Sequence, residues 1–181
     1  MAERHDSSIT WFKENLLKNG LYRPNRFLVS FSHPAPSEVE FEPEAVTLPG
    51  RSFVTITEQY FGPPRNVPVS NVFDNSVVMT FFVDENQSQR TFFEKWMQQM
   101  VSDENYSQGF GADLINRSPV IINTLTINGE VSSTYRLKEA FPTAIFPMNL
   151  GQEMRDAYGR IQVQFSYTSY TYESAIPDPT T

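Results

Sequence analysis

Apolar and polar residues alternate along several segments of the chain, most regularly near its C-terminal end. There the sequence reads IQVQFSYTSYTY, and four apolar residues alternate with four uncharged polar ones: Ile161, Val163, Phe165 and Tyr167 against Gln162, Gln164, Ser166 and Thr168. A period of two predicts one long β-strand over 161–172 with a single buried face. The opposite face is polar but carries no charge, so it is a candidate functional surface.

Other segments show strand patterns of the same kind, over 27–31, 52–60, 65–71, 76–83, 120–127 and 130–140. Ser76 to Val83 is apolar on both faces, which predicts a central strand. The segment 51–70 reads as a hairpin that projects from the body, and Pro68 restricts its second strand to an edge. Asn128-Gly129 predicts a tight primed turn. Residues 34–50 read as a loop with at most a short strand, and 141–159 as irregular.

Two segments have helical spacing instead. Ile9, Phe12 and Leu16 predict a short helix over 8–18 that ends at Asn19-Gly20. A second helix should start at Asp84 or Ser88 and run through Val101. Its apolar stripe has five members: Phe92, Phe93, Trp96, Met97 and Met100. Residues 102–119 read as a long loop, and 1–7 and 173–181 as flexible tails.

These elements predict a single mainly β (α+β) domain over residues 1–181. The strands pair mostly through hairpins, so we expect an antiparallel β-sandwich or barrel with a flanking helix.

Composition narrows the possible functions. The 181 residues carry a formal net charge of −7 and contain no cysteine, which excludes disulfides and thiolate metal sites. Proteins that grip nucleic acid neutralise phosphates with Lys and Arg, so 14 basic against 21 acidic residues disfavours that role. No segment has the length and apolarity of a membrane span or a signal core, which predicts a soluble protein made in the cytoplasm, with no membrane partner.

No catalytic constellation stands out. The sequence has no phosphate-binding Gly-rich loop and no Gly-x-Ser-x-Gly elbow, and its two histidines, His5 and His33, are far apart. We therefore expect no enzyme activity, no cofactor and no metal site.

One acidic run is a candidate for a metal or acid/base site: Glu38, Glu40, Glu42 and Glu44. Alternate residues of a strand share one face, so these carboxylates could form a metal or acid/base site. They also fit a solvated acidic loop, or an acidic patch that faces a basic partner. A soluble β-barrel that binds a ligand, or acts through these carboxylates, is accordingly one functional alternative.

Trp11 falls just off the apolar face of the predicted N-terminal helix. An exposed tryptophan there suits a subunit contact, and burial in the core is the competing interpretation.

Several motifs occur in an order that resembles a known family. A short helix precedes Arg23-Pro24-Asn25-x-Phe27, Ala-x-x-Leu-Pro-Gly over 45–50 leads into the hairpin, and Phe93-x-x-Trp96 lies on the second helix. An Asn-Gly hairpin, a Phe141-Pro142 corner and the long alternating strand follow. Over residues 10–172 the chain resembles the tail tube protein of contractile-tailed, myovirus-type bacteriophages.

The resemblance implies a structural protein of the virion. Such proteins form hexameric rings that stack into a hollow tube inside a contractile sheath, and strands from six subunits join into a barrel lining the channel. The implied partners are further copies of the chain, the tail sheath protein, and baseplate and tail terminator proteins. DNA would pass through without sequence-specific binding. A baseplate tube initiator, or the inner tube of a related contractile injection machine, is the alternative within this class.

With this resemblance, two sets of residues become candidate contact surfaces. The uncharged strand face would look into the lumen or onto a neighbouring subunit: Gln162, Gln164, Ser166 and Thr168. The hairpin would touch the next ring through Phe53, Ile56, Tyr60, Phe61, Arg65 and Val67. The competing interpretation is that the hairpin packs on its own body.

Overall fold

The computed structural model describes residues 22–32, 39–101, 119–153 and 158–175. Strands and one helix follow one another along these residues: β1 (Phe27–Phe31), β2 (Val39–Phe41), β3 (Ala45–Val46), β4 (Arg51–Glu58), β5 (Arg65–Phe73), β6 (Ser76–Phe82), α2 (Ser88–Met100), β7 (Val120–Leu125), β8 (Val131–Lys138), β9 (Phe141–Ile145), β10 (Arg160–Ser166) and β11 (Ser169–Ser174). The expected helix over 8–18, with Trp11, lies outside the described residues.

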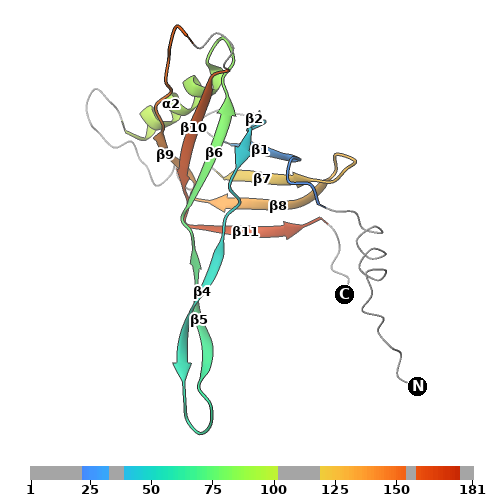
Figure 1. Ribbon diagram of the computed structural model, residues 1–181, viewed down its shortest axis with the longest axis vertical. Coiled ribbons are helices and arrows are strands. Elements are labelled where there is room, and N and C mark those ends of the chain that lie inside the picture. Colours follow the sequence, from blue (N-terminus) through green and yellow to red (C-terminus); the bar gives the residue numbers. More distant parts are fainter. Residues whose placement is uncertain (1–21, 33–38, 102–118, 154–157, 176–181) are drawn as a thin grey trace.

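The strands form two sheets and a separate hairpin (Figure 1). One sheet has five strands in the order β11-β8-β7-β1-β2, the other has four in the order β3-β6-β10-β9, and β4 pairs only with β5. Neighbouring strands are antiparallel throughout. The mainly β, antiparallel fold with a flanking helix is thus confirmed, and β6 lies inside its sheet, as its two apolar faces predicted.

An aromatic cluster fills the space between the two sheets and α2. Phe31 of β1 is fully buried and stacks on Phe165 of β10 with ring centroids 5.6 Å apart. Five further aromatic rings have centroids 5.6–6.3 Å from that of Phe31: Phe41, Phe81, Phe92, Phe93 and Trp96. Offset and edge-to-face ring pairs of this kind add to the free energy that burial supplies. The cluster joins both sheets to the helix.

Asp84 organises the first turn of α2. Its carboxylate accepts a hydrogen bond from the backbone N–H of Ser88 at 2.8 Å and another from the Ser88 hydroxyl. These bonds, the hydroxyl first, hold the pKa of Asp84 below its ordinary value. The residue before the helix, Gln87, has a left-handed backbone and gives no side-chain cap, so Asp84 takes that role from three residues upstream.

Replacing Asp84 with Asn should lower the melting temperature at pH 6, and the difference from the unmodified protein should shrink as the pH falls below about 3.9. Because folding depresses this pKa, the stabilisation is present above the unfolded value of about 3.9 and disappears as the pH falls through the folded value. Thermal melts of both proteins between pH 6 and pH 2 would measure the gap. A gap of constant size across this range would contradict the role given to Asp84.

The long C-terminal strand is not continuous, which corrects the sequence prediction. β10 and β11 belong to different sheets, and the chain bends between them at Tyr167 and Thr168. The N–H of Tyr167 donates to the carbonyl of Asn75, and that of Thr168 to the carbonyl of Lys138, both at 3.2 Å. Contacts far away in sequence therefore end β10, although the alternation continues through the bend.

Three smaller predictions also differ from the structure. Phe141–Ile145 forms β9 where an irregular segment was expected, and β2 and β3 are both short strands within 34–50. The tail expected from Glu173 begins later, because Glu173 and Ser174 pair with β8. The expected loop over 102–119 lies outside the described residues up to 118.

The Asn128-Gly129 turn joins β7 and β8 by a different geometry from the predicted one. The N–H of Gly129 donates to the carbonyl of Thr126, and the N–H of Thr126 to the carbonyl of Glu130. Within this described loop only Gly129 has a positive φ, of 83°. A primed two-residue turn centred on Asn128-Gly129 needs a positive φ at Asn128, whereas a three-residue loop with one left-handed glycine needs it only at the glycine.

Candidate assembly interface

The outer face of the four-stranded sheet is neutral and mostly polar. Three rows pair β10 with β6 across it: Gln162 with Thr80, Gln164 with Val78, and Ser166 with Ser76. Small residues extend the face to both sides, Ala45 opposite Thr80 and Ala144 opposite Gln164. The alternate residues of β6 and β10 are buried in the core, so this face points away from the body.

Charged side chains lie beside this face only at one end of the described sheet. Arg160 Nε lies 2.6 Å from Glu44 Oε2, and its guanidinium lies 5.3 Å from the ring centroid of Phe82. The positive charge of Arg160 and the negative charge of Glu44 cancel within this ion pair. The rows between Thr80 and Ser76 thus offer hydroxyls, amides and methyl groups, without an unpaired cation to hold a phosphate.

Thr168 does not belong to this face, although the sequence pattern placed it there. It lies at the bend after β10, and its hydroxyl donates to the carboxylate of Glu139. Gln162, Gln164 and Ser166 remain together on β10. Sequence reasoning missed the contributions of Ser76 and Thr80, because the apolar Val78 between them hides the alternation in β6.

Both lateral edges of the four-stranded sheet are unpaired among the described residues. β3 pairs only with β6 and β9 only with β10. Since each neighbouring pair is antiparallel, β3 and β9 run in opposite directions. An unpaired strand edge is a template for another strand, so the sheet can be continued at both sides.

Backbone hydrogen bonds show which groups of β9 point outward. The N–H of Phe146 donates to the carbonyl of Gln162 at 2.8 Å. In an antiparallel pair, bonding alternates along the strand, so the N–H of the preceding Ile145 points away from β10. This donor is available to a strand that adds at the β9 edge.

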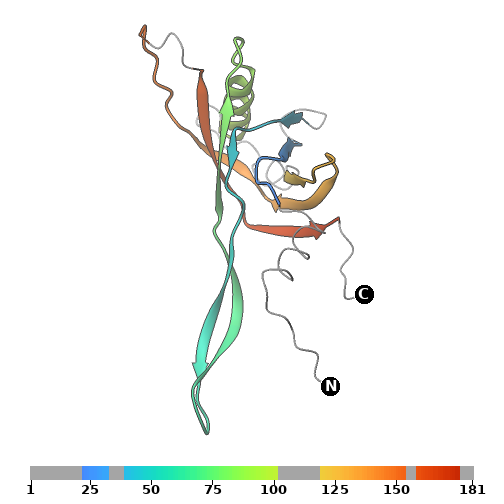
Figure 2. The same ribbon diagram turned by 45° about the vertical axis from the view of Figure 1, so that its right-hand side comes forward.

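The β4–β5 hairpin extends well beyond the two sheets (Figures 1 and 2). It covers 51–73, slightly more than the predicted 51–70. Of the six residues assigned to contacts with another ring, five are exposed and Val67 is half-buried; Phe53 is 61% and Tyr60 81% exposed. Arg65 lies 3.6 Å from Glu58. The aromatic and aliphatic side chains of the hairpin therefore face solvent in the single chain.

Contacts with β11 fix the base of the hairpin. The Arg51 guanidinium lies 5.4 Å from the ring centroid of Phe73 and 5.1 Å from that of Tyr170, and these two rings meet edge to face. Close by, the Tyr167 hydroxyl is buried without a hydrogen-bond partner. Burial, with the nearby Asp74 carboxylate, raises the pKa of Tyr167. The base is thus packed while the tip is free.

The acidic run does not form one strand face. Glu40 is exposed in β2, Glu42 is exposed after it, and Glu44 is paired with Arg160. Glu38 lies outside the described residues. No group of three His, Cys, Asp or Glu able to hold a metal occurs in the described part of the chain.

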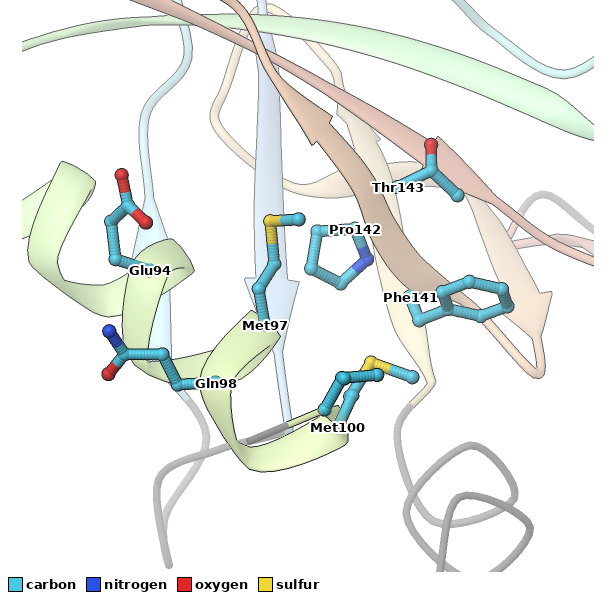
Figure 3. Close-up of a pocket in the computed structure, with 8 residues that line it drawn as sticks. Glu94, Met97, Gln98, Met100, Phe141, Pro142 and Thr143 are labelled. Atoms are coloured by element: carbon cyan, nitrogen blue, oxygen red, sulfur yellow. The ribbon is translucent and has the colours of Figure 1, made fainter. Parts of the chain in front are cut away.

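A hollow between α2 and β9 is the remaining notable surface (Figure 3). It has a volume of about 380 Å³, and apolar groups line its two walls: Met97, Met100 and Val101 from the helix side, Phe141 and Pro142 from the strand. We call it the α2–β9 groove.

Among the described helices, none is long and apolar enough to cross a membrane.

Comparison with known proteins identifies the fold. The chain matches the phage tail tube protein family over residues 22–173. No curated protein sequence matches it. Among solved structures, it is similar to a chain of the anti-feeding prophage baseplate, with a TM-score of 0.64 at 14% identity, covering 86% of this chain and 97% of that one.

Two further structures share the fold. One is a chain of the sheath–tube complex of an extracellular contractile injection system, PVC, with a TM-score of 0.62 at 12% identity, covering 90% of this chain and 97% of that one. The other is the SPP1 tail tube, with a TM-score of 0.51 at 9% identity, covering 86% and 81%. From the family match, which spans most of the sequence, we conclude that this chain belongs to the phage tail tube protein family.

Proposed function

We propose that the protein is the tube subunit of a contractile phage tail. Six copies close into a ring, rings stack into a hollow tube inside the sheath, and the genome leaves through the channel. Copies of the same chain, the sheath protein, and baseplate and terminator proteins are its partners. The work is structural, and no residue is assigned a catalytic role. The protein is accordingly located in the virion.

The observation that carries this proposal is the combination of two free edges with a neutral outer face on one sheet. β3 and β9 run in opposite directions. When β9 of one copy meets β3 of the next, the new pair is again antiparallel. A head-to-tail contact of this kind forms a closed ring if its rotation closes. Closure also removes the exposed edges that would otherwise favour aggregation.

In such a ring the neutral face of β6 and β10 lines the lumen. Short hydroxyl and amide side chains hydrate the wall, and the absence of unpaired cations leaves no site for phosphate. The net charge of −7 adds weak repulsion. DNA can then move along the wall without being held.

Replacing Gln162 and Gln164 with Lys should slow DNA ejection while rings still form. The two lysines would repeat around the channel and attract phosphates, since each phosphate contact contributes a salt-dependent binding term. We expect an ejection defect that weakens as the salt concentration rises. Serine replacements at both positions are the matched control and should eject normally. Unchanged ejection by assembled lysine tubes would place this face outside the lumen.

The β4–β5 hairpin supplies the contact between successive rings. A two-stranded ribbon is barely stable alone, and its exposed apolar residues gain stability when a second copy covers them. A cryo-EM map of assembled protein would test this by locating the hairpin. A hairpin folded onto its own subunit would exclude the contact.

Imaging and mass measurement of the purified protein test the proposal as a whole. We expect rings and tubes in negative stain, and a ring mass of six subunits by light scattering. A stable monomer at high concentration would instead support a soluble β-barrel that binds a ligand.

A second candidate is favoured by the fold similarity to the anti-feeding prophage and PVC structures, whose TM-scores exceed that of the SPP1 tube. In this reading the chain forms the inner tube, or the tube initiator, of a contractile injection machine. Isolated particles would decide between the two, since a phage tail is joined to a DNA-filled capsid.

A further inference from the structure

We propose that the α2–β9 groove receives Leu48 of the neighbouring copy in the same ring. The inference rests on the proposed ring and adds to it a side-chain contact that locks adjacent subunits. It begins from the position of the groove, because one of its walls is β9 itself. Any strand that pairs with the free edge of β9 must therefore pass along the mouth of the groove.

The walls of the groove call for an apolar occupant. Figure 3 shows Met97 and Met100 of α2 on one side and Pro142 of β9 on the other. Three polar residues also line the groove, Glu94 and Gln98 from the helix and Thr143 from β9. Methionine side chains adapt to the shape of a partner, and the volume of about 380 Å³ exceeds that of one aliphatic side chain.

Strand alternation selects the side of β3 that reaches the groove. Val46 pairs with Met79, whose side chain is buried in the core, so Val46 lies on the core side of the sheet. α2 covers that same side next to β9. When two copies pair through β3 and β9, residues on the core side of β3 meet the groove, and those on the outer side meet the lumen face.

Leu48 is the next residue on that side after Val46. The N–H of Thr47 donates to the carbonyl of Val78 at 3.1 Å, so the chain continues beside β6 past the end of β3. Pro49 favours an extended backbone at the residue before it. Leu48 is nevertheless 40% exposed, since no strand of its own chain lies beyond this edge in the described residues.

Cross-strand pairing places Leu48 and the α2–β9 groove at the same position along the strands of the sheet. Continued by two residues, the β3–β6 register places Leu48 beside Val77, which pairs with Phe165, and Phe165 pairs with Pro142. Leu48 and the groove are thus at opposite ends of one row. A shift of two residues at the junction keeps Leu48 on the core side, because side chains alternate with a period of two.

Cysteine cross-linking tests the contact directly, because the chain contains no cysteine of its own. We would prepare Leu48→Cys, Met97→Cys and the double variant, assemble each, and treat it with a short bismaleimide. The double variant should give a denaturant-resistant ladder up to the number of subunits in the ring. Each single variant should remain monomeric on the same gel.

A matched double variant, Phe61→Cys with Met97→Cys, tests the competing occupant, the hairpin tip of a copy in another ring. We expect at least tenfold less cross-linked product from this pair. A ladder from this pair, with monomers from the Leu48 pair, would overturn the inference. The groove must also be open before assembly, so Met97→Cys should react with maleimide in isolated subunits and be protected in rings. Protection already present in isolated subunits would overturn it as well.

The controls separate this inference from the proposed function. If the unmodified protein forms rings but the Leu48 pair gives no ladder in rings of normal appearance, only the groove contact is wrong. If the unmodified protein forms no rings, the proposed function and the contact fail together.

Discussion

Ring formation is expected to be lost when Ile145 is replaced by proline. Its outward N–H is the donor that β9 presents to an incoming strand, and proline removes this donor without removing any bond between β9 and β10. The fixed ring of proline also obstructs the approach of a neighbouring backbone. We expect a folded subunit that stays monomeric in light scattering at concentrations where the unmodified protein assembles.

Ile145→Ala is the matched control for this variant. It removes more of the half-buried side chain than proline does but keeps the backbone N–H, so it should still form rings. If both variants assemble, β9 is not the edge that closes the ring. If both fail, the side chain of Ile145, and not its hydrogen bond, is responsible.

The second large effect is expected from Phe31→Ala. Phe31 is fully buried and contacts rings from both sheets and from α2. Truncating a buried phenylalanine to alanine typically costs about 3–5 kcal/mol of folding stability, through lost burial and the cavity left behind. Against a total of about 5–15 kcal/mol for a typical protein, this change should bring the subunit close to unfolding.

Chemical denaturation of unassembled subunits would measure this loss. Phe53→Ala is the control, because the same atoms are removed from an exposed hairpin position, where a surface change usually stays within about 0.5 kcal/mol. Phe53→Ala should therefore affect assembly more than folding. Equal destabilisation by both variants would show that Phe31 does not organise the core.

Local patterns in the sequence were sufficient for the elements that depend on local rules. The apolar residues on both faces of 76–83 predicted the central strand β6, and the stripe containing Phe93 and Trp96 predicted the buried face of α2. The neutral face of β10 was also visible, because three of its residues share one side of one strand. In each case the residues that decide the structure are neighbours in sequence.

Features set by distant contacts were not predictable in the same way. The bend at Thr168 depends on carbonyls of Asn75 and Lys138, whereas the alternation itself runs on to Tyr172. Pro142 concealed β9, although an edge strand tolerates proline. The groove beside β9 required the position of α2 against that strand. These are the parts of the candidate interface that only the three-dimensional arrangement reveals.

The near-continuity of β5 and β6, separated only by Asp74 and Asn75, has a mechanical consequence. A pull on the hairpin tip is transmitted along the axis of β6, which is hydrogen-bonded on both sides to β3 and β10. Such a force shears many backbone bonds at once instead of unzipping them singly. A column of these subunits would therefore resist axial stretching far better than sideways peeling, a useful property in a shaft driven lengthwise.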